Sequence, residues 1–223
     1  MTADVLIEYL EMLGQGTLET IYMTMASALF SYIFGLPLGV ISVVSEPAGI
    51  LPNPKLHNVL DKIINITRSI PFIILLIALL PLTRLIVGTT IGPTASIVPL
   101  TIAAIPFVAR LVETALKEID YGIIEAAQSM GATPWQIIRK VMIPETLPSL
   151  IMGASITTIT LIGYSAMAGV CGGGGLGDLA IRYGYYRYED DVMILTIILL
   201  VIIVQIIQSI GDYLSKRIDK KNK

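Results

Sequence analysis

The stretch TIYMTMASALFSYIFGLPLGVISVVS, Thr20–Ser45, decides the fold, because its 26 residues include no Asp, Glu, Lys or Arg. Roughly 20 apolar residues in an α-helix, at about 1.5 Å each, cross the ~30 Å hydrocarbon layer of a bilayer. In the whole chain 54% of residues are hydrophobic and only 14% are charged, a charged share about half of that in soluble domains. The sequence therefore predicts an all-α membrane protein.

Three further segments are apolar over a comparable length. Val192–Gly211 contains 20 residues without a charge, and Leu85–Ala109 opens with turn residues and continues as a helix from about Thr94. A further run follows Pro148 and extends to the glycine cluster at Gly172. Each of these segments is long enough to cross the membrane once.

The remaining apolar segment, Ser69–Thr83, is too short by itself. Its 15 residues cover about 22 Å as a helix, so we expect this helix to begin earlier, near Val59. Asp61, Lys62 and Arg68 then lie at its headgroup end, where charged side chains are tolerated. With this segment, the sequence predicts five transmembrane helices.

The basic residues indicate the orientation of these helices, since cytoplasmic loops are enriched in Lys and Arg. Only Arg84, Arg182 and Arg187 lie in the loops of the other side. We therefore expect the N-terminus outside and the C-terminus in the cytoplasm. The first 16 residues are acidic and lack the basic region of a signal peptide, so we expect no cleaved leader. The loops after the first and third spans and the tail hold 12 of the 15 basic residues, namely Lys55, Lys62, Arg68, Arg110, Lys117, Arg139, Lys140, Lys216, Arg217, Lys220, Lys221 and Lys223.

Composition excludes several classes of function. The net charge of −2 gives no basic excess for binding nucleic acid, and a single Cys171 and a single His57 exclude a disulfide framework or a Cys/His metal cluster. The apolar segments hold no Asp, Glu, Lys or His away from their ends, so nothing relays a proton or holds a coupling ion. Transport by this chain would need energy from a partner.

A glycine cluster, GGGGLGD, resembles a nucleotide-binding pattern only in spacing. Gly172, Gly174 and Gly177 stand in G-x-G-x-x-G register, but the fingerprint must follow a strand and open a helix inside a βαβ unit. Asp178 stands where a P-loop has the Lys that reaches phosphates. We interpret this cluster as a flexible outer loop.

A long polar segment, 113–148, interrupts the apolar chain and contains EAAQSMGATPWQIIRKVMIP, Glu125–Pro144. Charged residues at the centre of a span cost about 2.5–3.5 kcal/mol each, so the segment is expected at the cytoplasmic surface. Asp120 is a candidate N-cap for a first helix, with Ile123, Ala127 and Met130 on one face. Gly131 is expected to end this helix in a left-handed conformation.

The second helix of this segment has its own start signals. Thr133 is placed as its N-cap, Pro134 at its first position and Gln136 as the partner in a capping box. We expect Ile143-Pro144 to end it and Pro148 to mark the return to the membrane. The predicted helix–turn–helix is either an amphipathic connector on the headgroups or a surface that docks into a groove of another protein. The apolar residues of the second helix are Trp135, Ile138, Val141 and Met142.

The spacing within this segment resembles the EAA signature of ABC importer permeases, written EAA, x3, G, x9, I, x, L, P. Val141 replaces Ile and Ile143 replaces Leu. The resemblance implies that the segment docks into a cleft of a cytoplasmic ATPase subunit and passes its movement to the spans. The matching residues are Glu125, Ala126, Ala127, Gly131, Val141, Ile143 and Pro144.

Longer segments narrow the resemblance to the permeases of methionine importers. These are NITRSIPFIILL (65–76), VGTTIGPTASIVPLTIAAIPFVAR (87–110) and LIGYSAMAGVCGGGGLGDLAIRYGY (161–185), and the similarity extends over about 17–212. It implies one transmembrane permease domain, 1–223, that is not an enzyme and binds no cofactor. ATP and Mg²⁺ would bind to two ATPase subunits, and the other partners would be a second copy of the chain, the lipid bilayer and an extracytoplasmic methionine-binding protein.

Tyr164, Ser165 and Met167 precede the glycine cluster and are candidates for the translocation path. Met167 and its counterpart in a second copy are expected to narrow that path, although Met also commonly fills gaps in apolar cores. Gly35 and Gly39 form a small-x3-small pair that marks a dimer interface, a tight internal contact or a kink at the proline between them.

Other residues leave both a functional and an ordinary interpretation open. Prolines in the second and third spans are expected either to bend the helices or to pack statically. An outward charged face either meets a binding protein or is merely solvated. Two alternatives to methionine transport also stay open, a permease for another small amino acid and a non-transporting anchor for a cytoplasmic ATPase. The prolines are Pro71, Pro81, Pro99 and Pro106, and the charged face holds Arg182, Arg187, Glu189, Asp190 and Asp191.

Overall fold

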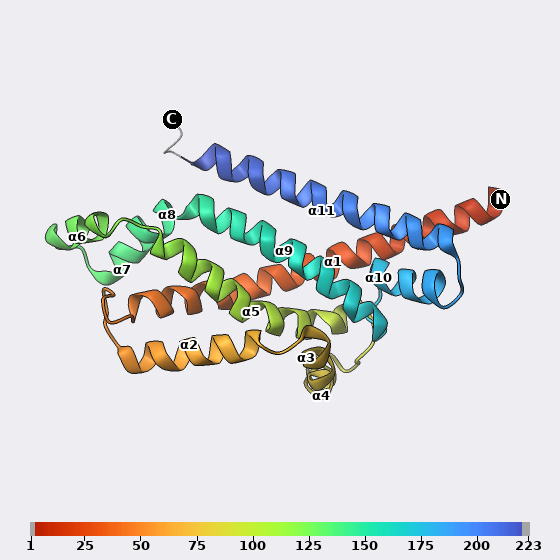
Figure 1. Cartoon of the computed structure of the whole chain (residues 1–223), viewed down its shortest axis with the longest axis horizontal. Helices are drawn as coiled ribbons and strands as arrows, with labels where there is room; N and C mark the ends of the chain where they lie inside the picture. The colour runs from red at the N-terminus through yellow and green to blue at the C-terminus, as the bar shows by residue number, and fades with distance from the viewer. Residues whose placement is uncertain (1–2, 220–223) are drawn as a thin grey trace. The chain divides into compact units, whose positions relative to one another are not determined.

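The computed structural model describes residues 3–219, with side chains from residue 9 onward. These residues form helices joined by turns, with no strand among them (Figure 1), so the expected all-α class is confirmed. The tail residues Lys220, Lys221 and Lys223, which entered the prediction of a cytoplasmic C-terminus, lie outside the described residues. In chain order the helices are α1 (Ala3–Val44), α2 (Pro54–Arg68), α3 (Phe72–Ala78), α4 (Leu80–Val87), α5 (Pro93–Lys117), α6 (Tyr121–Ser129), α7 (Pro134–Ile137), η1 (Ile138–Met142), α8 (Ile143–Glu145), α9 (Leu147–Val170), α10 (Gly175–Leu179), η2 (Ala180–Tyr185) and α11 (Asp190–Ile218).

Four of the described helices are long and apolar enough to cross a membrane. They are α1, α5, α9 and α11. The helix expected from about Thr94 begins at Pro93, whose missing N–H is tolerated in the first turn. These four helices correspond to four of the five predicted spans.

The second predicted span is not one helix, and this prediction is wrong. The residues from Val59 to Thr83 belong to α2, α3 and α4 instead. Helix α2 ends at Arg68, three residues before Pro71, which caps α3 with φ −57° and ψ 133°. A proline ring disfavours the helical conformation in the residue before it, so the chain cannot continue as a helix through this point.

The other prolines act differently according to their position. Pro81 stands at the second residue of α4, directly after the break at Leu79, where a proline is well tolerated. Pro99 and Pro106 lie inside α5, which nevertheless runs without interruption from Pro93 to Lys117. The prolines therefore divide the second predicted span and leave the third one continuous.

The chain forms two compact units, and each of the four long helices contributes residues to both. The first unit comprises residues 3–30, Ile70–Ala103 and Thr158–Gln208. The second comprises Ser31–Ser69, Ala104–Thr157 and residues 209–219.

In the first unit, helix α10 packs against α1 and α9. Leu13, Ile162, Leu176 and Ile203 are buried together, which places side chains from α1, α9, α10 and α11 in one apolar cluster. The N-terminus of α10 receives two hydrogen-bond acceptors from α1. The backbone N–H of Gly175 donates to Glu19 Oε2 at 2.8 Å, and that of Leu176 donates to Thr20 Oγ1 at 2.9 Å.

The glycine cluster is a packed turn, which overturns our interpretation of it as a flexible loop. Gly173, Gly175 and Gly177 are buried. Gly174 has φ +78°, a conformation that glycine adopts without strain. At Gly177 an added Cβ atom would meet the backbone of Ala166 in α9. The glycines therefore let the backbones of α9 and α10 approach each other closely.

In the second unit, Gly35 and Gly39 of α1 face α5. A Cβ atom at Gly35 would lie 2.8 Å from Val108 Cβ, and one at Gly39 would lie 2.6 Å from the carbonyl oxygen of Ala109. Of the interpretations of this pair, the structure shows the tight internal contact. Small residues at such a crossing allow the close helix packing that stabilises helices in lipid.

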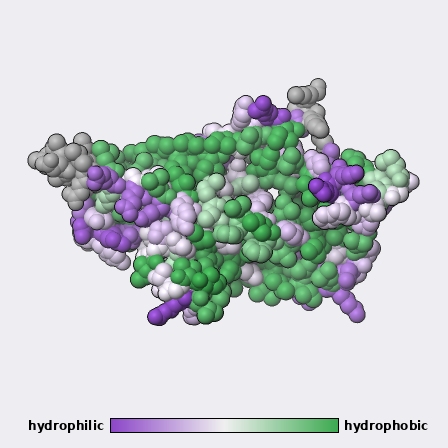
Figure 2. Space-filling view, turned by 180° about the vertical axis from the view of Figure 1, so that it is seen from behind, coloured by the Kyte–Doolittle hydropathy of each residue, from purple (hydrophilic) through white to green (hydrophobic). Residues whose placement is uncertain are grey.

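Apolar side chains also cover much of the surface. Figure 2 shows hydrophobic residues over a large part of the face that it presents. Only 6% of the most apolar 18-residue stretch of α11 is buried. This helix exposes large apolar side chains that include Ile194, Ile198, Val201 and Ile202. A surface of this kind matches a lipid environment.

Candidate functional site

The helix–turn–helix begins with the cap that the sequence indicates. Asp120 precedes α6, and its Oδ1 accepts a hydrogen bond from the backbone N–H of Gly122 at 2.8 Å. Helix α6 ends at Ser129, and Gly131 follows with φ +76°, so the prediction of a left-handed glycine is confirmed. The N–H of Gly131 donates to the carbonyl oxygen of Gln128 at 2.9 Å, which closes the end of the helix.

The second helix starts with a complete capping box, also as predicted. Thr133 Oγ1 accepts from the N–H of Gln136 at 3.4 Å, and Gln136 Oε1 accepts from the N–H of Thr133 at 2.9 Å. Pro134 occupies the first helical position. Only Met130–Thr133 separates the two helices, so their relative geometry is fixed by a short turn with satisfied backbone groups.

The end of this second helix differs from the prediction. Ile143-Pro144 does not end it, because α7 continues through the π-helical segment η1 into α8, which ends at Glu145. The N–H of Ile143 donates to the carbonyl oxygen of Ile138, five residues back. Pro144 has no N–H for the ordinary helical bond and its ring crowds the preceding turn. The wider π turn accommodates the proline without ending the helix.

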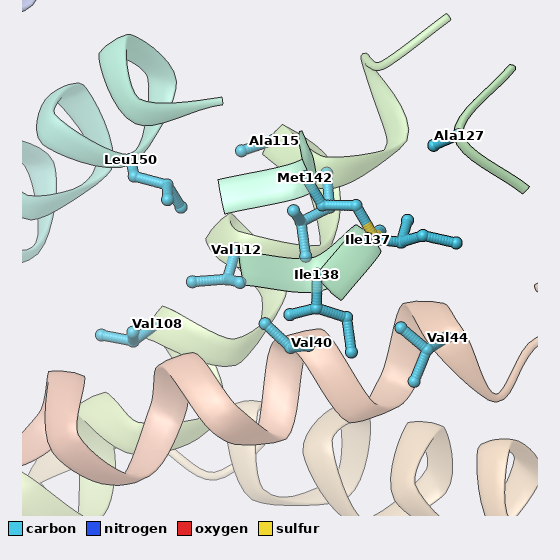
Figure 3. Close-up of a cluster of buried hydrophobic side chains, with 11 residues drawn as sticks. Val40, Val44, Val108, Val112, Ala115, Ala127, Ile137, Ile138, Met142 and Leu150 are labelled. Carbon is cyan, nitrogen blue, oxygen red and sulfur yellow. The ribbon is translucent and has the colours of Figure 1, made fainter. Parts of the chain in front are cut away.

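One face of the helix–turn–helix is anchored by buried apolar side chains. Ile137, Ile138 and Met142 lie between α1 and α5, and Ala127 contributes from α6 (Figure 3). Figure 3 shows Val40 and Val44 of α1 and Val108, Val112 and Ala115 of α5 around them. The segment is therefore fixed to these two helices through its apolar side chains.

The opposite face of the helix–turn–helix is exposed and partly apolar. The exposed fractions are 81% for Met130, 67% for Trp135 and 60% for Tyr121. Of the predicted face, only Ala127 is buried, and Ile123 is exposed together with Met130. An open groove of about 450 Å³ crosses this face, lined by Asp120, Gly122, Ile123, Ala126, Ala127, Met130 and Val141.

The residues of the predicted coupling motif divide between these two faces. Glu125, Ala126, Gly131 and Pro144 are exposed, and Ala127 is buried. Val141 and Ile143 are half-buried and pack against the apolar cluster. The motif thus combines residues that anchor the segment with residues that remain available to a partner.

A charged cluster at the end of α5 was missed by the sequence analysis. Glu113 is buried, and its carboxylate contacts Arg110 at 2.9 Å and Lys117 at 2.8 Å. Arg110 also pairs with Asp61 at 2.7 Å, and Lys117 pairs with Glu46 at 2.6 Å. The signal in the sequence was the spacing of opposite charges at i, i+3 and i, i+4 at the end of an apolar helix.

This cluster perturbs the ionisation of one carboxyl group outside the four apolar helices. The Arg110 guanidinium, which donates a hydrogen bond to Asp61, holds the pKa of the Asp61 carboxyl below its ordinary value of 3.8. Asp61 lies on α2 with 37% of its side chain exposed. The carboxylate is therefore charged at neutral pH and available as a fixed partner of Arg110.

The predicted path residues lie on α9 in three different environments. Ser165 is buried, and its hydroxyl donates to the carbonyl oxygen of Ile162 at 2.8 Å. Tyr164 stacks on Phe72 of α3 with ring centroids 4.4 Å apart. Met167 has 48% of its surface exposed, on the same side of the helix as Gly163 and Val170. Of the three, Met167 is the side chain most available to a second molecule.

The charged face predicted around Arg182 and Glu189 contains interactions that organise it. Tyr9 donates a hydrogen bond to Glu189 at 3.2 Å, and the Arg187 guanidinium lies 4.5 Å from the centre of the Tyr183 ring. Arg182 pairs with Asp178 one helical turn away. Among the described residues, no group of three His, Cys, Asp or Glu side chains is placed to hold a metal ion.

Comparison with known proteins gives a consistent result. Residues 35–220 match the family model of the binding-protein-dependent transport system inner membrane component. A probable D-methionine transport system permease protein MetI of Vibrio cholerae is 54% identical over 95% of this chain and 94% of its own length. The D-methionine transport system permease protein MetI of Escherichia coli is 56% identical over 71% of this chain and 73% of its own length.

Solved structures agree at the level of the fold. One that describes inward-facing conformations of the MetNI methionine ABC transporter matches with a TM-score of 0.95 and 50% identity, over 99% of this chain and 100% of that chain. A crystal structure of an amino acid ABC transporter with histidines matches with a TM-score of 0.78 and 21% identity, over 97% of this chain and 100% of that chain. At that identity the second match shows the fold alone.

The matched family and the four long apolar helices identify a multi-pass protein of the inner membrane. The match over 35–220 includes the whole helix–turn–helix, all of α5 and the part of α1 from residue 35 onward, which holds Val40 and Val44 of the anchoring cluster. The chain therefore belongs to the family of binding-protein-dependent transport system inner membrane components.

Proposed function

We propose that this chain is the transmembrane permease subunit of an ABC importer for methionine. The observation that carries this proposal is the 54% identity, over 95% of the chain, to a protein named as a D-methionine transport permease. The TM-score of 0.95 to a chain of the MetNI methionine ABC transporter supports it. The matched family is a transport family. In this proposal the chain forms part of the transmembrane path and is not an enzyme.

In this proposal the chain crosses the membrane five times, with its N-terminus outside. Helices α1, α5, α9 and α11 supply four crossings. The remaining crossing is made by the broken segment that runs from the end of α2 through α3 and α4, with Asp61 outside the membrane at its headgroup end. Lys and Arg support the orientation, since 12 of the 15 lie in the loops assigned to the cytoplasm and in the tail.

The helix–turn–helix is the docking surface for a cytoplasmic ATPase subunit in this proposal. Its buried face fixes it to α1 and α5, and its exposed face offers a groove of about 450 Å³ with Met130 beside it. An apolar groove on a rigid pair of short helices suits insertion into a complementary cleft. ATP and Mg²⁺ bind to that partner, and the 113–148 segment receives the movement that hydrolysis produces.

The complete importer contains two copies of this chain, two ATPase subunits and an extracytoplasmic methionine-binding protein. The exposed side of α9 that carries Met167 faces the second copy, and the path for methionine runs between the two. The face with Arg187 and Glu189 is the contact for the binding protein, and its ordered interactions support a specific surface there.

Reconstitution tests the function directly. The chain is assembled with its ATPase subunits in proteoliposomes, the binding protein is supplied outside, and uptake of radiolabelled methionine is measured with and without ATP in the compartment of the ATPase. We expect ATP-dependent uptake that unlabelled methionine abolishes and polar amino acids leave intact. Uptake displaced better by another amino acid would identify a different permease, and ATP hydrolysis without any uptake would support an anchor.

A further inference from the structure

Helix α5 presents two different faces near its C-terminal end. Val108, Val112 and Ala115 contribute to the apolar cluster that anchors the helix–turn–helix. Arg110, Glu113 and Lys117 follow at i, i+3 and i+7, which places them on another face of the same helix. The second face is therefore charged where the first one is apolar.

Glu113 lies at the centre of this charged face. Its side chain is 3% exposed. Oε2 accepts hydrogen bonds from Arg110 Nη1 at 2.9 Å and from the Ser42 hydroxyl of α1 at 3.5 Å, and Oε1 accepts from Lys117 Nζ at 2.8 Å. A buried carboxylate is tolerated only when charges and hydrogen bonds compensate it, and each oxygen of Glu113 has that compensation.

The two cations extend the network to neighbouring elements. Arg110 Nη2 donates to Asp61 Oδ1 at 2.7 Å and to Asn65 Oδ1 at 2.8 Å, both on α2. Lys117 Nζ pairs at 2.6 Å with Glu46, which follows the end of α1. Through Glu113 and its partners, α1, α2 and the end of α5 are joined in a single ionic network.

The same end of α5 leads directly into the helix–turn–helix. After Lys117, the N–H of Glu118 donates to the carbonyl oxygen of Ala115 at 3.2 Å, and the N–H of Ile119 donates to that of Leu116 at 3.4 Å. Asp120 then caps α6. The connection between α5 and α6 is thus a short hydrogen-bonded turn.

We propose that Glu113 is a positioning residue for energy coupling, because its buried carboxylate ties the end of α5 to α1 and α2 so that movement of the helix–turn–helix moves these helices together. This inference rests on the proposed function, in which the helix–turn–helix receives that movement from an ATPase. Removing the charge leaves Arg110 and Lys117 without their shared partner and loosens α5 from its neighbours.

The experiment compares Glu113→Gln with wild type in the reconstituted importer and measures methionine uptake and ATP hydrolysis per assembled complex. Energetic coupling between sites is typically worth a factor of about 5 or more, so we expect uptake per ATP hydrolysed to fall by about that factor. In Glu113→Gln, co-purification of the ATPase subunits and their rate of ATP hydrolysis should stay close to the wild-type values. A purely structural role would instead lower the amount of assembled complex and leave the ratio of uptake to hydrolysis unchanged.

Three further variants make the outcome decisive. Glu113→Asp keeps the charge and should retain most of the coupling. The matched control Glu11→Gln removes an exposed carboxylate of α1, outside the 113–148 segment, and should leave the ratio unchanged. If Glu113→Gln does not assemble, Asp61→Asn tests the same network at its exposed edge and should lower the ratio more weakly. An unchanged ratio in Glu113→Gln, or in Asp61→Asn where Glu113→Gln does not assemble, overturns the inference. Failure of wild type to take up methionine overturns the proposed function instead.

Discussion

At the scale of single residues, Gly131 shows how one backbone conformation positions the helix–turn–helix. Its φ of +76° lies in the left-handed region, and no atom outside its chain neighbours lies within 4 Å of the position of a Cβ atom. The requirement for glycine therefore comes from the backbone of this chain and not from crowding within it. A left-handed conformation costs an L-residue about 1–2 kcal/mol, and asparagine tolerates it better than most side chains.

This distinction predicts different results for two substitutions. Gly131→Val should distort the turn and reduce co-purification of the ATPase subunits strongly, because a β-branched residue strongly resists a positive φ. Gly131→Asn should retain most of the co-purification, because asparagine tolerates a left-handed conformation. The fraction of ATPase subunit that co-purifies with the detergent-solubilised chain measures both. Equal losses in the two variants would mean that the bulk of the side chain at the interface matters, and not the conformation of the turn.

The ion pair of Asp61 and Arg110 predicts a dependence of stability on pH. Because the folded chain lowers the pKa of Asp61 below 3.8, the pair contributes stability fully above that pH and loses it as the pH falls through the folded pKa. With 37% of the Asp61 side chain exposed, we expect a contribution of about 0.2–1 kcal/mol.

Thermal unfolding in detergent at a series of pH values tests this expectation. Wild type should be slightly more stable than Asp61→Asn at neutral pH, and the difference should vanish in acid below the folded pKa. A difference that persists in strong acid would show that the substitution acts through packing and not through the charge of Asp61.

At the scale of elements, the contact between α1 and α5 depends on two glycines. A side chain at Gly39 would meet Val112 at 2.7 Å and the Ala109 carbonyl oxygen at 2.6 Å. Overpacking of this kind typically costs about 1–3 kcal/mol. We expect Gly39→Leu to lower the thermal stability of the chain. Gly14→Leu is the matched control on the same helix, because no atom lies within 4 Å of its Cβ position, and an equal loss in both variants would contradict the contact.

The local signals of the helices could be predicted from the sequence wherever a side chain and its backbone partner are only a few residues apart. Asp120, the capping box of Thr133 and Gln136, and the left-handed Gly131 belong to this group, and all are confirmed. The apolar runs also identified four long helices because length and composition alone determine whether a helix can cross a bilayer.

Features that depend on competition between signals were predicted less well. At Pro71 a steric restriction on the preceding residue divided a segment whose apolar composition favoured one helix. At Pro144 the same kind of restriction produced a π turn instead of an end, because the apolar contacts of Ile138 and Met142 hold the helix in place. Hydropathy alone does not distinguish these outcomes.

The sequence motif defines the candidate site as a segment of the chain but not as a surface. The motif located Glu125–Pro144, whereas the division into a buried face with Ala127 and an exposed face with Met130 depends on where α1 and α5 pack. The network around Glu113 was missed for a related reason: Arg110 pairs with Asp61 and Lys117 pairs with Glu46, and the residues of each pair lie far apart along the chain. Long-range ion pairs leave no periodic signal in a single sequence.

At the scale of the whole molecule, long apolar helices are joined to one helix–turn–helix that presents an exposed surface. The apolar cluster fixes that segment to α1 and α5, and the ionic network of Glu113 ties α5 to α2. Two exposed methionines, Met130 on the helix–turn–helix and Met167 on α9, are assigned to different partners. This difference allows a direct test.

The measurement is photo-crosslinking in membranes that contain the complete importer, with a photoreactive phenylalanine derivative placed at position 130 or, in a separate variant, at position 167. We predict that position 130 crosslinks to the ATPase subunit and that position 167 crosslinks to a second copy of this chain. If position 130 yields no product with the ATPase subunit in an importer that still takes up methionine, the helix–turn–helix is not the docking surface and the account of energy coupling is wrong.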